Sequence, residues 1–294
     1  MARFGRVLTA MVTPFGDDGE LDAKGAADLA RWLVEHGNDG LVLAGTTGES
    51  PTLSDDERIE LFRAVRAAVD VTLIAGATTN DTAHSVRLVE AATETGMDAI
   101  LAVTPYYNRP SQAGLAAHFR AVAAATHLPV MLYDIPLRTG RKIATETMLD
   151  LARDVATIVA VKDAAGDLAG TARLVAAAPE GFEVYSGEDT LTLPLLAVGA
   201  VGTVGVATHW CAAAQAEVVD AFIGGDPARA RTLNARLLRS FAFESTDAAP
   251  NPVPSKAMLR VLGHRVGECR LPMGPTPAGL EDEALSIATE LGLR

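Results

Sequence analysis

One alternation runs through most of this sequence and limits the folds open to it. Short apolar runs alternate with stretches whose apolar residues recur at helical spacing. The apolar runs are, in order, RVLTAMVTP, DGLVLAG, VTLIAGA, DAILAVTP, PVMLYDIP, TIVAVKDA, FEVYSG and VGTVGVAT. Strands that alternate with helices form right-handed βαβ units and a parallel sheet. The sequence therefore predicts an α/β protein.

Several of the helical stretches carry their own boundary signals. Ser54 and Glu57 in SDDE have the spacing of a capping box, which predicts that a helix begins there. Two other stretches, DAKGAADLARWLVEHG and DTAHSVRLVEAATETG, end in the glycine that commonly follows a helix. These signals separate the expected helices cleanly from the apolar runs.

The number of units favours a closed barrel. Eight strand-helix units at a repeat of roughly 25–30 residues fit a (β/α)8 TIM barrel. The alternative is an open doubly wound sheet, which usually has a Gly-rich turn after its first strand, and TPFGDDG does not match that fingerprint. The strand signal stops near Gly225, and the remaining segments have helical patterns. We expect a barrel over residues 1–225 and a C-terminal helical extension over residues 226–294.

Composition excludes some classes of partner. The 294-residue chain has a formal net charge of −12, so nucleic acid, which needs clustered Lys and Arg, is not an expected partner. No segment has the length and apolar character of a membrane span or a signal peptide. Cys211 and Cys269 form no CxxC pattern, which suits a reducing compartment. These features together predict a cytoplasmic protein.

A lysine at the end of the sixth apolar run is the main candidate for chemistry. In TIVAVKDAAG, four apolar residues lead directly to Lys162. The active sites of such barrels lie at the carboxyl ends of the strands, where a lysine is partly desolvated. Desolvation lowers the pKa of an amine, and a neutral amine forms Schiff bases with carbonyl compounds. The alternative is a structural lysine that is paired with Asp163, Glu188 or another carboxylate.

Other expected strand ends carry polar groups. In AGTTGES, Thr46 and Thr47 offer hydroxyls and backbone N–H groups, which form a small nest for a carboxylate or phosphate, or else an ordinary turn. In LYDIPLRTG, Tyr133 can transfer protons and Arg138 can grip a carboxylate, unless they are a packed tyrosine and a solvated arginine. In TPYYNRPSQ, Tyr107 is one of two adjacent tyrosines suited to packing or to a subunit contact.

The six histidines form no HxxxH or HxH pair, so we predict no metal site. An imine-forming amine, a phenol, a carboxylate nest and an arginine suit a 2-oxo acid. The amine condenses with the keto group, and the imine then acts as an electron sink. This chemistry needs no metal and no organic cofactor.

The sequence resembles dihydrodipicolinate synthases, which belong to the class I aldolase superfamily that includes N-acetylneuraminate lyase. The resemblance covers nearly the whole chain. It is carried by GTTGESPTL, VTPYYNRPSQ, LYDIPLRTG, VKDAAGDL and GEDTLTLPLLAVGAVGTVGV, which stand in the family's order and spacing. It implies that the substrates are pyruvate and L-aspartate 4-semialdehyde, that the pathway is lysine and diaminopimelate biosynthesis, and that the assembly is a homotetramer.

The resemblance also implies roles for single residues. Lys162 forms the Schiff base with pyruvate and Tyr133 is the acid–base residue beside it. The resemblance further implies that Thr47 holds the pyruvate carboxylate and that Arg138 holds the carboxylate of the semialdehyde. Thr46 would link Tyr133 to Tyr107 of a neighbouring subunit. Gly187 and Val204 would give backbone contacts around the pyruvate moiety.

Some positions depart from the family pattern. Asp134 and Asp163 stand where many relatives have Asn and Glu, which keeps the polarity of both positions. In the region linked to feedback inhibition by lysine in some members, His84 replaces a glutamate, and Asp55 and Arg58 replace histidines. A group that would pair with the lysine ammonium is therefore missing, and we expect weak or absent inhibition by lysine.

Two other functions fit many of the same residues. An aldolase or dehydratase that acts on sugar-derived 2-oxo acids would share the lysine and the tyrosine, although Arg138 and Tyr107 favour the synthase. A non-catalytic protein that binds a 2-oxo acid would need the carboxylate nest but no proton relay, because fold alone does not fix function.

Overall fold

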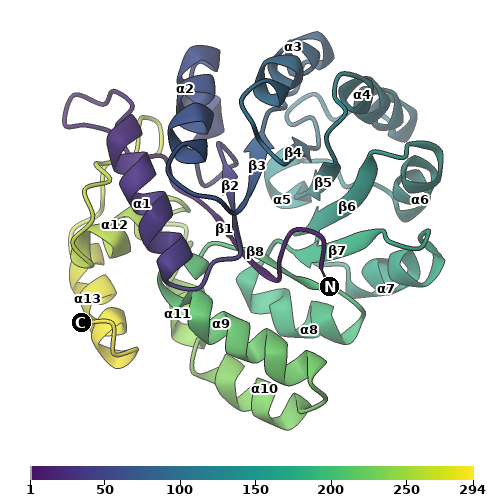
Figure 1. Cartoon of the computed structure of the whole chain (residues 1–294). Coiled ribbons are helices and arrows are strands. Elements are labelled where there is room, and N and C mark those ends of the chain that lie inside the picture. Colours follow the sequence, from purple (N-terminus) through teal and green to yellow (C-terminus); the bar gives the residue numbers. More distant parts are fainter. Residues whose placement is uncertain (1) are drawn as a thin grey trace.

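The computed structural model describes residues 2–294, and these form a closed barrel of eight parallel strands surrounded by helices (Figure 1). The strands are β1 Val7–Ala10, β2 Gly40–Leu43, β3 Thr72–Gly76, β4 Ala99–Val103, β5 Val130–Asp134, β6 Ile158–Asp163, β7 Glu183–Ser186 and β8 Gly202–Gly205. Each strand pairs with its neighbours in the sequence, and β8 closes the barrel by pairing with β1. The predicted (β/α)8 barrel is confirmed.

The helices that follow the strands cover the outside of the barrel. They are α1 Ala23–Glu35, α2 Asp55–Arg66, α3 Thr82–Thr93, α4 Gln112–Ala124, α6 Thr145–Asp154, α7 Leu168–Ala177, α8 Thr192–Ala197 and α9 Thr208–Ile223. The four-residue α5 Pro136–Thr139 lies instead in the loop after β5, at one end of the barrel. Two short 3-10 helices, η1 Ser50–Thr52 and η2 Asp189–Leu191, lie in the loops after β2 and β7. Ser54 accepts from the N–H of Glu57, and the Glu57 carboxylate accepts from the N–H of Ser54, so the predicted capping box is confirmed.

The strands are buried on both faces, which explains why they are continuous apolar runs rather than alternating ones. One set of side chains fills the barrel interior, and it includes Leu8, Val42, Ile74, Met131 and Tyr185. The opposite set packs against the surrounding helices in the main core. The barrel is thus a filled core, and free space for chemistry is confined to its ends.

After α9 the chain forms the C-terminal helices α10 Pro227–Ala235, α11 Leu238–Phe243, α12 Val253–Val261 and α13 Leu280–Glu290. The helical segment expected from residue 226 onward is broken between α10 and α11. Leu259 of α12 and Val266 after it join the main core, so the extension packs into the barrel layers. In Figure 1, α12 and α13 lie on the same side as α1. The division of the chain at Gly225 stays a prediction.

A buried ion pair fastens this extension to the loop after β2. Lys256 Nζ lies 2.7 Å from Glu49 Oε1, and both side chains are almost completely inaccessible to solvent. Lys256 also donates to the carbonyl oxygen of Glu268 at 3.0 Å, and its Nζ lies 4.1 Å from the centre of the Phe15 ring. The other carboxylate oxygen of Glu49 accepts from the N–H of Arg270 at 2.8 Å. Glu49 therefore connects the loop after β2 to two segments that follow α11.

Removal of one member of this pair should be costly, because the other is left charged and buried. We expect Glu49→Leu to lower the free energy of unfolding by about 3–5 kcal/mol, and Glu49→Leu with Lys256→Met to recover a large part of that loss. Urea unfolding at a fixed protein concentration measures both changes.

The control is the exposed pair Lys24–Asp28 on α1. Lys24→Met should change the free energy of unfolding by at most about 1 kcal/mol. If Glu49→Leu lowered the free energy of unfolding by no more than Lys24→Met does, the buried pair would not have the predicted effect on stability.

Candidate active site

Lys162 lies at the carboxyl end of β6, the sixth strand of the barrel. Its partner in the parallel register is Tyr133 of β5, and Lys162 Nζ lies 4.5 Å from the centre of the Tyr133 ring. Only 4% of Lys162 is exposed. The strand register thus places an amine beside a phenol within the mouth of the barrel.

Burial is the main influence on both groups. It lowers the pKa of Lys162 to about 8, although the negative charges of Asp189, Glu188 and Glu244 act in the opposite direction. It raises the pKa of Tyr133 to about 12, against a hydrogen bond with Thr46 that lowers it. At pH 7 a fraction of Lys162 on the order of one tenth is therefore neutral and nucleophilic, while Tyr133 keeps its proton.

Lys162 makes no ion pair with a carboxylate of residues 2–294. The carboxylate of Asp163 is engaged elsewhere, since it accepts from the N–H of Ala165 at 2.9 Å and from the Thr171 hydroxyl. This geometry disfavours the interpretation of Lys162 as the structural partner of Asp163.

The two threonines lie in a strained turn after β2. Ala44 and Glu49, on either side of the turn, have left-handed φ values of 50° and 57°, which are uncommon for residues other than glycine. Thr47 is buried, and its hydroxyl accepts from Asn251 Nδ2 at 2.9 Å. Strain of this kind concentrates at functional sites.

Asn251 links this turn to the arginine. Its carbonyl oxygen accepts from Arg138 Nη2 at 3.1 Å, while its side chain holds Thr47. Sequence reasoning missed Asn251, because it lies 204 residues from Thr47 and stands in an unremarkable NP dipeptide. The C-terminal extension therefore contributes directly to this end of the barrel.

A cavity of about 90 Å³ brings these residues together. Its walls include six of the predicted site residues, which are Thr46, Thr47, Tyr133, Arg138, Lys162 and Gly187. Among the other lining residues are three that the sequence did not indicate, namely Glu244, Ser245 and Asn251. The cavity is thus formed partly by the barrel and partly by the extension.

Two predicted residues lie elsewhere. Val204 is fully buried among the interior side chains of the barrel, and Val206, two residues further along, lines the cavity. Tyr107 follows β4 and is 89% exposed, with a left-handed φ of 70°. Within one chain, Tyr107 does not line the cavity.

Gly187 is required by the close approach of the lysine. A Cβ atom at this position would lie 2.8 Å from Lys162 Cγ and 3.0 Å from Lys162 Cε. The Gly187 N–H also donates to the carbonyl oxygen of Asp163 at 2.7 Å, which fixes the loop after β7 against β6. Glycine therefore leaves room for the lysine stem.

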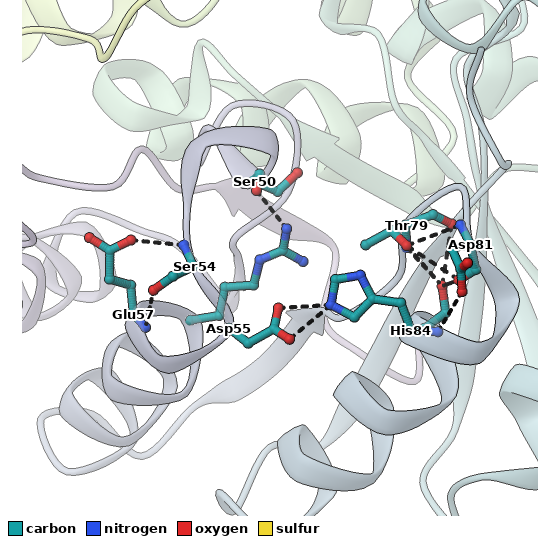
Figure 2. A network of polar contacts seen from close by, with 9 residues as sticks. Ser50, Ser54, Asp55, Glu57, Thr79, Asp81 and His84 are labelled. Carbon is teal, nitrogen blue, oxygen red and sulfur yellow. Dashed lines mark hydrogen bonds and ion pairs between the residues drawn. The ribbon is translucent and has the colours of Figure 1, made fainter.

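A second polar cluster lies at the N-terminal ends of α2 and α3 (Figure 2). His84 Nε2 lies 2.8 Å and 3.0 Å from the two carboxylate oxygens of Asp55. Arg58 is buried and donates through Nη2 to the carbonyl oxygen of Ser50 at 2.6 Å, whereas its Nε and Nη1 have no partner among residues 2–294. The cluster thus carries a buried guanidinium and a histidine that is already paired.

Among residues 2–294, no three His, Cys, Asp or Glu side chains gather in a way that could hold a metal ion. No helix within the same residues is both long and apolar enough to cross a bilayer.

The closed barrel and its desolvated lysine define a class I aldolase-type lyase. The chain belongs to the dihydrodipicolinate synthetase family, whose model matches residues 3–290.

Relatives and solved structures agree with this assignment. The 4-hydroxy-tetrahydrodipicolinate synthase of Moorella thermoacetica is 47% identical over 99% of both chains, and that of Acidothermus cellulolyticus is 52% identical over 92% of this chain and 87% of its own. A crystal structure of the Cyanidioschyzon merolae enzyme with lysine bound has 42% identity, a TM-score of 0.97 and full coverage of both chains. The chloride-inhibited Acinetobacter baumannii enzyme complexed with pyruvate has 33% identity and a TM-score of 0.92, and covers 99% of this chain and 100% of its own.

The contact at Gly187 generates a prediction. Gly187→Ala should displace the Lys162 side chain without unfolding the barrel, because the new methyl group overlaps the lysine stem. A displacement of about 1 Å can cost about 100-fold in rate, so we expect imine formation with pyruvate to slow by about 10- to 100-fold. Borohydride trapping followed by intact-mass measurement gives the rate. An unchanged rate would show that alanine fits at this position without displacing the Lys162 side chain.

Proposed function

We propose that this protein condenses pyruvate with L-aspartate 4-semialdehyde to give 4-hydroxy-tetrahydrodipicolinate, a step of lysine and diaminopimelate biosynthesis. The observation that carries the proposal is the buried Lys162 amine beside Tyr133 at the mouth of the barrel. The family assignment and the names of the relatives support the choice of reaction.

The first half of the reaction uses the barrel residues. Neutral Lys162 attacks the keto carbon of pyruvate, and Tyr133, which keeps its proton, supplies it to the departing oxygen as water leaves. Thr47 and the amides of its turn bind the pyruvate carboxylate. The Tyr133 phenolate then takes a proton from the methyl group, which gives the enamine and restores the phenol. Thr46 lines the same cavity as Tyr133 and takes part in the return of protons.

The second half brings in the semialdehyde. Arg138 stands at the rim of the cavity with its guanidinium tethered to Asn251, and it binds the carboxylate of the second substrate. The enamine attacks the aldehyde carbon, and the aldehyde oxygen takes up a proton and becomes a hydroxyl group. The substrate's ammonium group gives up a proton, and the free amine then attacks the imine carbon and displaces the Lys162 amine. Gly187 and Val206 line the cavity and enclose the pyruvate moiety, so Val206 takes the place that the resemblance gave to Val204.

Tyr107 is assigned to a neighbouring subunit's site in a homotetramer built as a dimer of dimers. Its 89% exposure and left-handed backbone present the phenol outward from its own chain, which supports a role between subunits. The cytoplasm is the proposed location, because the composition predicts a reducing compartment.

The alternative is an aldolase or dehydratase for sugar-derived 2-oxo acids, which would use the same Lys162 and Tyr133. Turnover with pyruvate and aspartate semialdehyde, and none with sialic acid or 2-keto-3-deoxygluconate, separates the two. A binding protein without activity would give no turnover with any of these compounds.

The lowered pKa of Lys162 leads to a pH dependence. Below a pKa of about 8, the neutral fraction of the amine rises about tenfold for each pH unit and levels off above it. The initial rate of borohydride trapping at low pyruvate concentration should follow this curve. Peptide mapping should place the adduct on Lys162, and Lys162→Ala should give none. A flat profile, or an adduct on Lys24, Lys142 or Lys256, would reject the assignment.

The cluster of Figure 2 leads to a prediction about feedback. A free lysine ammonium would meet the buried Arg58 guanidinium and a histidine already paired with Asp55, so we expect lysine at about 1 mM to leave most of the activity intact. Initial rates over a lysine titration test this. His84→Glu combined with Arg58→His supplies a carboxylate and removes the guanidinium, and should increase sensitivity. Strong inhibition of the unmodified enzyme at that concentration would overturn the prediction.

A further inference from the structure

Two carboxyl groups in the cavity wall have no part in the steps above. They belong to Glu188, which follows β7, and Glu244, which follows α11. The cations that line the same cavity are Lys162, which reacts with pyruvate, and Arg138 at the rim. Glu244 forms no ion pair with any Lys, Arg or His of residues 2–294.

Glu244 is held in a defined place. Only 6% of it is exposed, and its Oε2 accepts from the N–H of Ala207, immediately before α9, at 3.1 Å. Helix α11 is fixed to α9 because Trp210 Nε1 donates to the Ser240 hydroxyl and the Trp210 and Phe243 rings meet edge to face. A packed helix rather than a loose loop therefore delivers this carboxyl to the cavity.

The surroundings of Glu244 are negative. Asp189 is completely buried, and its two oxygens accept from the N–H of Val206 at 2.7 Å and from Gln215 Nε2. Burial and then the charges of Asp189 and Glu188 raise the pKa of Glu244 well above its usual range. A cation that entered the cavity beside Glu244 would relieve this repulsion and restore its charged form.

We propose that Glu244 binds the α-ammonium group of L-aspartate 4-semialdehyde while Arg138 binds its carboxylate. The assignment rests on the proposed function, and it explains how the site would select an amino acid over a simple aldehyde acid. Glu244 is favoured over Glu188 because a charge-assisted hydrogen bond gains strength when it is desolvated. Glu188 is only half-buried and already accepts from the Thr190 hydroxyl at 3.0 Å.

The test compares two aldehydes that differ in the amine. Glu244→Gln keeps the size of the side chain and an acceptor for the Ala207 N–H, and it cannot take up a negative charge when the ammonium group binds. We expect KM for aspartate semialdehyde to rise by about 10- to 100-fold, the range that corresponds to loss of one hydrogen bond to a charged group. Succinic semialdehyde lacks the amine, so Glu244→Gln should change its inhibition constant by less than about twofold.

Three further variants sharpen the comparison. Glu188→Gln should raise KM for aspartate semialdehyde by less than about threefold, because that carboxylate is closer to solvent. Asp247→Asn removes an exposed negative charge from the same segment and should leave KM unchanged. Glu244→Asp keeps a carboxyl group. It should therefore retain more of the preference for aspartate semialdehyde over succinic semialdehyde than Glu244→Gln does, and this comparison still holds if the glutamine variant folds poorly.

Borohydride trapping with pyruvate separates the two hypotheses. Absence of a pyruvate adduct in the unmodified enzyme would overturn the proposed function and this assignment together. Normal trapping in Glu244→Gln, with equal losses for both aldehydes or with no loss for either, would overturn the assignment of Glu244 alone. A selective rise in KM for aspartate semialdehyde in Glu188→Gln, and not in Glu244→Gln, would also overturn the assignment of Glu244.

Discussion

The proposed chemistry depends on the removal of one amine from water. A change in the pKa of Lys162 from 10.5 to about 8 corresponds to roughly 3 kcal/mol against the charged form. Burial dominates this change, although three nearby carboxyl groups oppose it. A closed barrel achieves the burial because its interior is filled by side chains and the lysine rises from the last layer into a small cavity.

The C-terminal extension matters to this site as much as the barrel does. Asn251 holds Thr47 with its side chain and Arg138 with its carbonyl oxygen, so a single residue aligns groups that follow β2 and β5. The buried pair of Lys256 and Glu49 anchors the same region of the extension to the turn that carries the threonines. The cavity is therefore closed by residues that belong to no strand of the barrel.

The sequence could predict what depends on local pattern. The strands, the capping box at Ser54 and the position of Lys162 at a strand end follow from runs and spacings of a few residues. Asn251 and Glu244 could not be found in this way, because their importance arises from contacts across the fold with residues far away in the chain. Val204 and Val206 show a further limit on what the sequence pattern can predict about the cavity wall. Alternate residues of a strand share a face, so the pattern identifies the face but not the residue at which the filled interior gives way to the cavity.

The conformation and exposure of Tyr107 support a contact with a second chain. A bulky residue with a left-handed φ is strained, and strain of this kind persists where surrounding structure enforces it. Here the residue is 89% exposed, so contacts within its own chain do little to enforce the conformation. A second subunit packed against this loop would both bury the phenol and stabilise its backbone, and would bring a further proton donor towards the neighbouring Tyr133. In that arrangement the proposed assembly and the proposed chemistry share one cause, because the relay proposed for Tyr133, Thr46 and Tyr107 would be completed only between two subunits.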